Sequence, residues 1–481
     1  MAPDAASSNG AATRFDTAWL TTTTGGELLR RGGDSISGGA IDSRLVSEGV
    51  AFFALPGDRT DGHRFLESAV ESGAAALVVS AELEPERLDR LHAGGRVSIV
   101  RVPDTAAALR AVSGAYRDRF SPLVVGITGS LAKTSTKEQI AEVLEERFEV
   151  LRNPANWNNE IGLPMTLLRL RPEHEVAVLE MGLYTTGEIA LLASLARPSI
   201  GVVTAVRGVH LSRAGSIEAI EAGKRELVEA LPPEGWAILN ADDERVRRMA
   251  DHTAARVRTY GFAEDADVRA TNVVSLGTEG MRFTLHLDAQ SYEVNTPVLG
   301  RHGVHNALAA VAVADRAGMD IADVITGLAR PLQMPHRSQL VAAGPWNILD
   351  DSYNASPDAV LAALDLLTEL PGRHIAVLGE MLELGDSAEP EHRRVGAYAA
   401  DTADRLVIVG DGAHGIADGA MERGLDADRI TLAADRDEAL TALLAQLRDG
   451  DSILVKASRG AALDLLVERL VLAGGAGEAE A

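Results

Sequence analysis

The sequence predicts an α/β protein of three domains: a small α/β N-terminal domain, a central P-loop-type domain with a parallel sheet, and a C-terminal Rossmann-like, doubly wound domain. Three observations predict this class. The chain has 481 residues, enough for about three domains of ordinary size. Strand patterns alternate with helical patterns in two long segments, which is typical of parallel sheets covered by helices. A glycine-rich stretch, GITGSLAKTSTKE at 126–138, separates an apolar run from a helical pattern.

The first domain is expected at residues 15–118, after a disordered tail of small and polar residues at 1–14. Buried strands are expected at 51–55 and 74–80, and helices at 65–73 and 105–117.

The central domain is expected at residues 119–337 and opens with the glycine-rich stretch. Its further strands are predicted at 176–182, 200–206 and 236–240, followed by helices at 187–195, 216–231 and 243–250. Residues 281–287 alternate apolar and polar side chains, as an antiparallel strand with one solvated face does. A hinge at 333–338 leads out of this domain.

The third domain is expected at residues 338–470, with a second disordered tail at 471–481. Its strands are predicted at 346–350, 374–379, 405–409, 429–433 and 452–456, each followed by a helical pattern. This alternation indicates a separate doubly wound sheet.

Composition excludes several classes of function. The formal net charge is −24, which disfavours nucleic acid and anionic membranes as partners. The chain has no cysteine, so disulfides, thiolate metal sites and cysteine nucleophiles are excluded. The N-terminus lacks the pattern of a secretory signal, and the apolar runs are too short to span a bilayer. We therefore expect a cytoplasmic protein that does not insert into membranes.

The glycine-rich stretch has the chemistry of a phosphate loop. Backbone N–H groups and the positive end of a helix bind a phosphate, and Gly129 lets the backbone approach it. Lys133 adds a charge, and the hydroxyl of Thr134 can ligate Mg²⁺. The strict phosphate-loop pattern fails at Ile127 and Ala132, so an ordinary strand–turn–helix is the alternative. If the backbone needs a positive φ at Ala132, the cost is about 1 kcal/mol.

Three further polar residues follow strand patterns and could meet at one edge of the parallel sheet. Glu180 ends an otherwise apolar strand, where a carboxylate is costly unless it has a partner. His210 and Lys224 come after the next strand. Each has a plainer interpretation: His210 as a structural histidine, and Lys224 as a surface lysine paired with Glu221 or Glu226.

The motifs together resemble those of the ATP-dependent Mur ligases of peptidoglycan synthesis, over roughly residues 40–470. The resemblance is closest to the members that add D-alanyl-D-alanine to a UDP-muramoyl tripeptide. It is carried by IDSRLVSEGVAFFALPGDRTDGHRF, GITGSLAKTSTKE, NPANWNNEIGLP, VLEMG, GVHL, AGKRE, ILNADD, RHGVHNALAA, DDSYNASPDAV, VLGEMLELG and VKASRG.

The resemblance implies an ATP-dependent ligase that joins a carboxylate to an amine through an acyl phosphate. Its substrates would be a UDP-muramoyl peptide and D-alanyl-D-alanine, with ATP and two Mg²⁺ ions. The family also implies a monomer and a carbamylated lysine, which matches Lys224 here.

The resemblance assigns site residues by position in this chain. The catalytic residues would be Lys133, Lys224, His210 and Glu180, and the metal ligands Thr134, Glu180, His210 and Lys224. The nucleotide contacts would be Gly129, Ser130, Lys133, Thr134, Ser135, Asn240, Asp242, Asn306, Arg337, Asp351, Tyr353 and Asn354. The UDP-peptide contacts would be Ser43, Arg44, Asp61, Gly62, His63, Asn158 and Asn159. For those in the first domain, a structural role in turns is the alternative.

The chain departs from the family pattern at several positions. Ala132 and His336 stand where glycines are usual, and Ser356 replaces the second asparagine of N-A-N-P. TAVRGVHLSRAGS lacks the asparagine after its first threonine and the phenylalanine before Gly215. Two alternatives therefore stay open: a sister ligase with another amine or UDP-peptide, and a nucleotide- or UDP-peptide-binding protein without turnover.

Overall fold

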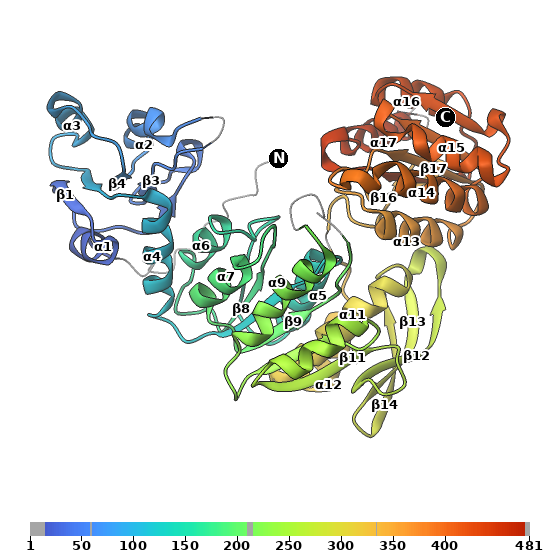
Figure 1. Ribbon diagram of the computed structural model, residues 1–481, viewed down its shortest axis with the longest axis horizontal. Coiled ribbons are helices and arrows are strands. Elements are labelled where there is room, and N and C mark those ends of the chain that lie inside the picture. Colours follow the sequence, from blue (N-terminus) through green and yellow to red (C-terminus); the bar gives the residue numbers. More distant parts are fainter. Residues whose placement is uncertain (1–14, 58–59, 209–214, 333, 477–481) are drawn as a thin grey trace.

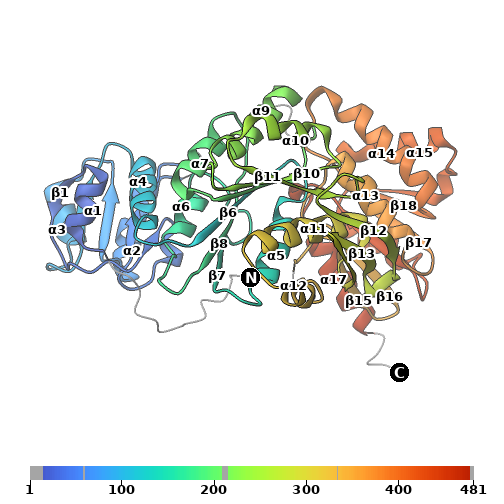
Figure 2. The ribbon, with the colours of Figure 1, turned by 90° about the horizontal axis from the view of Figure 1, so that it is seen from below.

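The computed structural model describes residues 15–57, 60–208, 215–332 and 334–476. The first and third domains lie on opposite sides of the central domain (Figures 1 and 2). Each domain contains one sheet, so the predicted three-domain α/β fold is confirmed. Within the described ranges, none of the helices combines the length and the apolar character that a membrane span needs. The predicted tail at 1–14 lies outside the described residues.

The first domain has a five-stranded sheet in the order β1-β5-β4-β3-β2, parallel except that β1 runs antiparallel to β5. The predicted helix at 105–117 is α4, with Asp104 as its N-terminal cap. The elements are α1 (Thr17–Thr24), β1 (Glu27–Arg30), β2 (Gly39–Ala40), η1 (Ser43–Leu45), β3 (Ala51–Phe53), η2 (Gly62–Phe65), α2 (Leu66–Glu71), β4 (Ala76–Val79), α3 (Pro85–Leu91), β5 (Ser98–Arg101) and α4 (Thr105–Arg117).

The central domain has a nine-stranded sheet in the order β14-β13-β12-β11-β10-β9-β6-β8-β7. The elements are β6 (Leu123–Thr128), α5 (Lys133–Leu144), β7 (Val150–Arg152), α6 (Gly162–Leu167), β8 (Val176–Glu180), α7 (Glu188–Ala196), β9 (Ile200–Val203), α9 (Ile217–Glu229), β10 (Trp236–Asn240), α10 (Glu244–Arg247), η3 (Arg248–His252), β11 (Arg256–Gly261), β12 (Val268–Ser275), η4 (Gly277–Glu279), β13 (Met281–Leu287), β14 (Gln290–Thr296), α11 (Gly300–Arg316) and α12 (Ile321–Leu328). The predicted antiparallel strand at 281–287 is β13, which pairs with β12 and β14.

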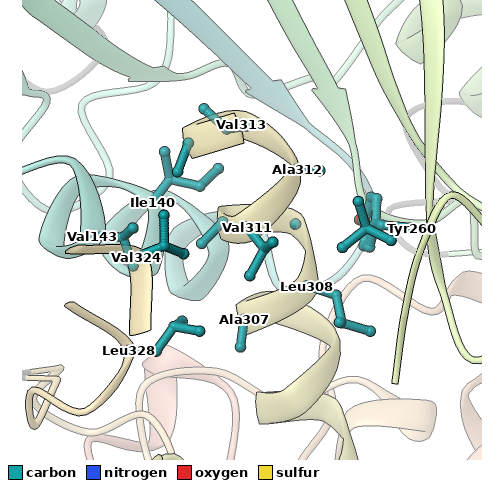
Figure 3. Close-up of a cluster of buried hydrophobic side chains, with 14 of the residues drawn as sticks. Ile140, Val143, Tyr260, Ala307, Leu308, Val311, Ala312, Val313, Val324 and Leu328 are labelled. Carbon is teal, nitrogen blue, oxygen red and sulfur yellow. The ribbon is translucent and has the colours of Figure 1, made fainter. Parts of the chain in front are cut away.

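Helices cover both faces of the central sheet. In Figure 2, α5, α11 and α12 lie on one side of the strands, and α7 and α9 lie on the other. The first of these layers encloses a core in which Ile140 of α5, Val311 of α11 and Val324 of α12 pack together (Figure 3). This core holds α5 in place, and with it the end of the glycine-rich stretch from which α5 begins.

The third domain has a six-stranded sheet in the order β15-β16-β20-β17-β18-β19, in which β15 is antiparallel to β16 and the other pairs are parallel. The elements are β15 (Gln339–Ala343), β16 (Trp346–Asp350), α13 (Pro357–Thr368), β17 (His374–Gly379), η5 (Gly385–Ser387), α14 (Ala388–Thr402), β18 (Arg405–Val409), η6 (Asp411–Ala413), α15 (His414–Arg423), η7 (Ala427–Arg429), β19 (Ile430–Ala433), α16 (Arg436–Leu444), β20 (Ser452–Lys456), η8 (Arg459–Ala461) and α17 (Asp464–Ala476).

The prediction of a disordered tail at 471–481 is wrong for residues 471–476. Helix α17 continues to Ala476, because Leu470 and Val471 pack against the core of the third domain. Gly474 then lies against the backbone of Ala343 and Gly344, in the turn after β15. A composition of small residues had indicated disorder here, but small residues also allow this close backbone contact. Residues 477–481 lie outside the described part.

Candidate active site

The glycine-rich loop lies against the end of strand β9. Gly129 has a φ of 153°, and a Cβ at this position would lie 1.8 Å from the hydroxyl oxygen of Thr204. No other residue fits there without moving the strand. The next residue, Ser130, donates its N–H to the carbonyl of Ala205 at 2.7 Å.

Ala132 occupies left-handed backbone, with φ 61° and ψ 5°, directly before the first residue of α5. A β-carbon in this region costs about 1–2 kcal/mol, so glycine is the residue that fits best here. The side chain of Ala132 makes no cap hydrogen bond that would offset the strain. The cost expected from the sequence therefore applies, and it is small enough for the loop to keep its shape.

Lys133 opens helix α5 and folds back over the loop. Its Nζ donates to the carbonyl oxygen of Gly129 at 2.7 Å. Burial lowers the pKa of Lys133, while the charge of Glu180 opposes this shift and the charge of Arg337 adds to it. The loop lysine, the strand carboxylate and the hinge arginine therefore lie close enough to influence one another.

Glu180 is buried at the end of β8 and is the centre of a hydrogen-bond network. Thr134 donates its hydroxyl to one carboxylate oxygen at 2.8 Å, and Asn158 donates to the other at 2.7 Å. Asn153, which the sequence reasoning missed, fixes the strand end by exchanging two hydrogen bonds with the backbone of Glu180. The signal for Asn153 was its place in NPANWNN, beside the predicted Asn158.

Lys224 lies on α9 and is only 3% exposed. Among the residues that the structure describes, its Nζ has neither a hydrogen bond nor an ion pair. Burial lowers its pKa well below the ordinary value, and the nearby charge of Lys133 adds to this. The plainer interpretation fails because Glu221 pairs with Arg245 and Glu226 caps the first turn of α7.

His210 lies outside the described residues, so its predicted role stays a prediction. Within the described ranges, no cluster of three or more acidic or histidine side chains could bind a metal by itself. Glu180 and Thr134 nevertheless present a carboxylate and a hydroxyl oxygen at one point, which suits a hard cation whose other ligands come from phosphates.

The hinge brings together residues from the central and third domains. The guanidinium of Arg337 stacks on the ring of Tyr353, with its carbon 3.9 Å from the ring centroid. The backbone N–H of Ser338 donates to Asp351 at 3.0 Å, and Lys456 forms an ion pair with the same carboxylate. Lys456 was not among the predicted residues, although VKASRG contains it.

His336 and Asn354 complete the hinge. His336 has a φ of 64°, a left-handed backbone conformation that favours glycine. Its Nδ1 lies 2.8 Å from a carboxylate oxygen of Asp350, which anchors the side chain. The carbonyl of Asn354 accepts a hydrogen bond from Lys456 at 3.0 Å.

A cavity of about 270 Å³ lies between α5, α11 and the hinge. Its polar lining includes Ser135, Gln139, Asn306 and Arg337, and the rest of its wall is largely apolar. Asn306 is buried and accepts a hydrogen bond from the hydroxyl of Thr136 at 3.1 Å. Three of the predicted nucleotide contacts, Ser135, Asn306 and Arg337, thus line one cavity.

Asn240 and Asp242 serve the loops around the sheet and do not line this cavity. Asn240 donates to the carbonyl of Thr204 at 2.7 Å and accepts from the backbone of Asp242 at 2.8 Å. Asp242 accepts hydrogen bonds from the N–H groups of Phe262 and Ala263, both at 2.8 Å. Their predicted contact with the nucleotide stays a prediction.

Two more residues in this region were missed by the sequence reasoning. His305 lies 3.0 Å from the side-chain oxygen of Asn240 and 3.2 Å from Asp242. Arg207 exchanges hydrogen bonds through its backbone with the hydroxyl of Ser130 and forms an ion pair with Asp243. A histidine in HGVHN and an arginine in TAVRGVH were the available signals.

The predicted first-domain residues lie in the two turns that follow the adjacent parallel strands β2 and β3. Ser43 is buried in η1, and Arg44 is exposed and paired with Asp42 at 2.6 Å. The neighbouring turn at Asp61, Gly62 and His63 begins η2.

The turn at 61–63 has a structural role. Nε2 of His63 accepts the N–H groups of Ser80 at 2.9 Å and Ala81 at 3.2 Å, so its proton lies on Nδ1 and is donated to Asp61. A Cβ on Gly62 would come within 2.8 Å of the backbone of Leu55. These contacts support the alternative of a structural turn, while Ser43 and the exposed Arg44 stay candidates for substrate contact.

Asn158 and Asn159 have different partners in the structure. Asn158 is bound to Glu180, as described above. Asn159 is exposed and accepts the N–H groups of Ile161 and Gly162, which starts helix α6. Its predicted contact with substrate is untested.

Comparison with protein families identifies the chain. Three family models match it in succession: "Mur ligase family, catalytic domain" at residues 35–117, "Mur ligase middle domain" at 127–314, and "Mur ligase, glutamate ligase domain" at 336–459. The chain belongs to the Mur ligase family. The predicted resemblance is confirmed, and with it the class of ATP-dependent ligases that form carbon–nitrogen bonds.

This Mur ligase is similar to curated proteins that carry one name. It is 39% identical over 472 residues to the UDP-N-acetylmuramoyl-tripeptide–D-alanyl-D-alanine ligase of Mycobacterium tuberculosis, covering 90% of this chain and 91% of that protein. It is 36% identical over 457 residues to the enzyme of the same name from Escherichia coli, covering 94% and 97%.

Solved structures agree with this assignment. A crystal structure of MurF from Acinetobacter baumannii matches with a TM-score of 0.86 at 28% identity, covering 96% of this chain and 100% of that chain. A structure of MurF ligase from Thermotoga maritima in complex with ADP matches with a TM-score of 0.78 at 26% identity, covering 92% and 97%.

Proposed function

We propose that this Mur ligase joins D-alanyl-D-alanine to the terminal carboxylate of a UDP-N-acetylmuramoyl tripeptide, with ATP as the energy source. Relatives whose names carry this activity are 35–39% identical over most of the chain. The observation that carries the proposal is the convergence of Lys133, Glu180 and Lys224 beside the glycine-rich loop. Such a site suits phosphoryl transfer, in which catalysis is mostly positioning and stabilisation of charge.

The reaction has two steps. A carboxylate oxygen of the UDP-peptide attacks the γ-phosphorus of ATP, the bond to ADP breaks, and an acyl phosphate forms. Lys133 neutralises negative charge on the β- and γ-phosphates while that bond breaks. The amine of the dipeptide then attacks the acyl carbon, phosphate leaves with the bonding electron pair, and the amine loses a proton.

Two Mg²⁺ ions belong to the proposal. Thr134 and Glu180 would hold the first, since their oxygens meet at one point. His210 and a carbamylated Lys224 would hold the second. When bound, Mg²⁺ would neutralise phosphate charge. Asn158 keeps the Glu180 carboxylate in position for this role.

The surroundings of Lys224 support its proposed carbamylation. A protonated lysine beside Lys133 would repel both it and a metal ion. Because burial lowers the Lys224 pKa, the amine is more often neutral and can attack CO₂, forming a carbamate with release of one proton. The carbamate turns a buried amine without a partner into an anionic oxygen ligand.

The incoming dipeptide is proposed to enter a second cavity, of about 430 Å³, in the third domain. It opens beyond the carboxyl ends of β17 and β18, where ligands of doubly wound sheets bind. Glu380 and Arg436 line it, and neither side chain has an ion pair among the described residues. Asp411, Asp435 and Asp437 also line the cavity. The carboxylates suit the amine of a zwitterionic dipeptide, and the guanidinium of Arg436 suits its carboxylate.

Closure of the third domain over the nucleotide completes the proposed site. Arg337, Asp351, Tyr353 and Asn354 lie where the two domains meet and would contact the nucleotide, which excludes water from the acyl phosphate. Ser43 and Arg44 would contact the uridine nucleotide. We further propose a monomer that works in the cytoplasm, where ATP is available.

The test is phosphate release from ATP and Mg²⁺ with a UDP-muramoyl tripeptide, with and without D-alanyl-D-alanine. Release that needs both substrates, together with a product heavier by the dipeptide, supports the proposal. Release only with another amine or another UDP-peptide indicates the sister ligase. Binding of the UDP-peptide without any release indicates a binding protein. A Lys133→Met variant, which keeps the fold and removes the loop charge, is the negative control.

A further inference from the structure

Lys137 is a buried, charged side chain of the glycine-rich stretch to which the proposed mechanism gives no role. It lies on α5, one turn after Lys133, and is 0% exposed. Its Nζ donates to the carbonyl oxygen of Asn153 at 2.7 Å and lies 2.8 Å from a carboxylate oxygen of Glu138. A lysine is almost never fully buried unless its charge is paired. Glu138 supplies that pairing here, and the carbonyl of Asn153 sets the direction of the ammonium group.

Two adjacent residues of α5 hold two adjacent residues at the end of β7. Lys137 binds the carbonyl of Asn153, and Glu138 forms an ion pair with Arg152, with 3.3 Å between Oε2 and Nη1. Consecutive residues of a helix do not face each other, so the two contacts approach the chain from different directions. The loop that follows β7 is therefore attached to the helix that begins at the phosphate loop.

Asn153 connects this attachment to Glu180. Its side-chain oxygen accepts the N–H of Glu180 at 2.9 Å, and its amide nitrogen donates to the carbonyls of Glu180 at 3.1 Å and Trp157 at 2.9 Å. Trp157 directly precedes Asn158, whose side chain donates to the Glu180 carboxylate at 2.7 Å. One asparagine thus fixes both the backbone of Glu180 and the loop that orients its carboxylate.

We infer that Lys137 is a positioning residue for the magnesium site: through Asn153 it sets the place and direction of the Glu180 carboxylate. The inference rests on the proposed role of Glu180 as a ligand of Mg²⁺. Groups that hydrogen-bond to the ligands of a metal fix their orientation, and losing such a group typically weakens metal binding by about 10–100-fold. Without the ammonium group of Lys137, the carbonyl of Asn153 loses this donor and the loop is no longer tied to α5 at that point.

The test measures how much Mg²⁺ strengthens the binding of ADP, by calorimetric titration of ADP with and without the metal. Lys137→Met keeps the apolar stem of the side chain and removes its charge. We expect the affinity for ADP without Mg²⁺ to be unchanged, because the phosphate loop is intact, and the gain from Mg²⁺ to fall about tenfold. Hydrogen–deuterium exchange of the metal-free variant should be faster over residues 153–162.

Arg152→Met is the matched control, because it breaks the ion pair with Glu138 and leaves the carbonyl of Asn153 bound to Lys137. It should leave the gain from Mg²⁺ unchanged. If Lys137→Met lowers the melting temperature, the double variant Lys137→Met/Glu138→Gln removes the carboxylate that has lost the lysine. This double variant should recover stability without recovering the gain from Mg²⁺.

Three results would overturn the inference. The first is an unchanged gain from Mg²⁺ in Lys137→Met, and the second is a gain that returns together with stability in the double variant, which would make Lys137 purely structural. The third is a wild type whose affinity for ADP does not depend on Mg²⁺. Failure of the proposed function is a separate result: a wild type that releases no phosphate contradicts the ligase, while loss of the gain from Mg²⁺ in Lys137→Met still supports the role of Lys137.

Discussion

Two buried lysines, one in the central domain and one in the third, have the same exposure and opposite surroundings. Lys224 and Lys456 are each 3% exposed. Lys456 forms an ion pair with Asp351 and donates to the carbonyl of Asn354. Lys224 has no partner in the described part of the chain, and burial lowers its pKa. The third domain satisfies its buried charge internally, whereas the central domain leaves one free for chemistry.

The same contrast holds for strained backbone. His336 in the hinge and Ala132 in the phosphate loop both stand at positive φ, 64° and 61°. The ring of His336 is anchored to Asp350, while Ala132 has no compensating contact. The strained residue of the hinge is therefore compensated by a contact of its side chain, and the strained residue of the phosphate loop is not.

Replacing Lys456 with methionine should have the largest effect on stability. Breaking a buried ion pair leaves Asp351 without its partner and costs about 3–5 kcal/mol. Urea unfolding should show this loss. The double variant Lys456→Met/Asp351→Asn should recover part of it, since no charge is then left unpaired. A Lys456→Met variant that is as stable as the wild type would contradict the comparison of Lys456 with Lys224.

Replacing Lys224 with methionine should raise the stability of the fold and strongly reduce the release of phosphate. Removing a charged group from the reacting centre should lower the rate of phosphate release at least about 10²-fold. In buffer without CO₂ the variant should be about 2 kcal/mol more stable at neutral pH, because it removes a buried amine that has no partner and whose charged form is disfavoured by folding.

The pH dependence of that gain follows from the lowered pKa. Protonated Lys224 costs the folded state wherever the pH lies below the ordinary value of 10.5. The stability of the wild type rises between the folded pKa and 10.5, so the advantage of Lys224→Met should shrink as the pH approaches 10.5. An advantage that is independent of pH would show that the charge is not its cause.

A glycine at position 336 should have a smaller, destabilising effect. Losing the hydrogen bond to Asp350 costs about 1.5–3 kcal/mol, since one partner is charged. Relief of the left-handed strain returns about 1–2 kcal/mol, less the entropy of a glycine in the unfolded chain. We expect a net loss of about 1 kcal/mol in thermal unfolding. A net gain would show that the anchor is weaker than the strain.

A glycine at position 132 should have the smallest effect, and in the opposite direction. No contact is lost, so the relieved strain exceeds the entropy cost by about 0.5 kcal/mol. The melting temperature should rise slightly and the rate of phosphate release should not change. A large increase in rate would instead mean that Ala132 distorts the loop and impairs the ligase.

The sequence predicted the parallel parts of both larger sheets well. The strands at 236–240, 346–350, 374–379, 405–409 and 452–456 have the predicted bounds, because apolar runs between turn residues leave little choice. Strands β7, β11, β12, β14 and β15 were not predicted. Of these, β14 and β15 lie at sheet edges, where exposed residues interrupt the apolar pattern. Helix α17 passed the predicted end because its packing, and not its composition, decides where it stops.

The structure brings predicted site residues together where a motif fixes them on a strand end or loop, and their roles stay predictions. Glu180, Thr134 and Lys133 meet as expected. The partners of such residues come from elsewhere in the chain, so Asn153, Arg207 and His305 could not be assigned from sequence alone. Unpaired atoms, such as those of Gln139, are visible only when all surrounding elements are in place.

The central claim is that Lys224 is left without a partner so that it can become a carbamate. The most direct measurement is ¹³C NMR of the purified protein in ¹³C-bicarbonate. The chain has only four lysines, Lys133, Lys137, Lys224 and Lys456, so signals are easily assigned. We predict one carbamate signal in the wild type that persists in Lys456→Arg and disappears in Lys224→Arg. No signal at saturating bicarbonate, or a signal that survives Lys224→Arg, would contradict the account.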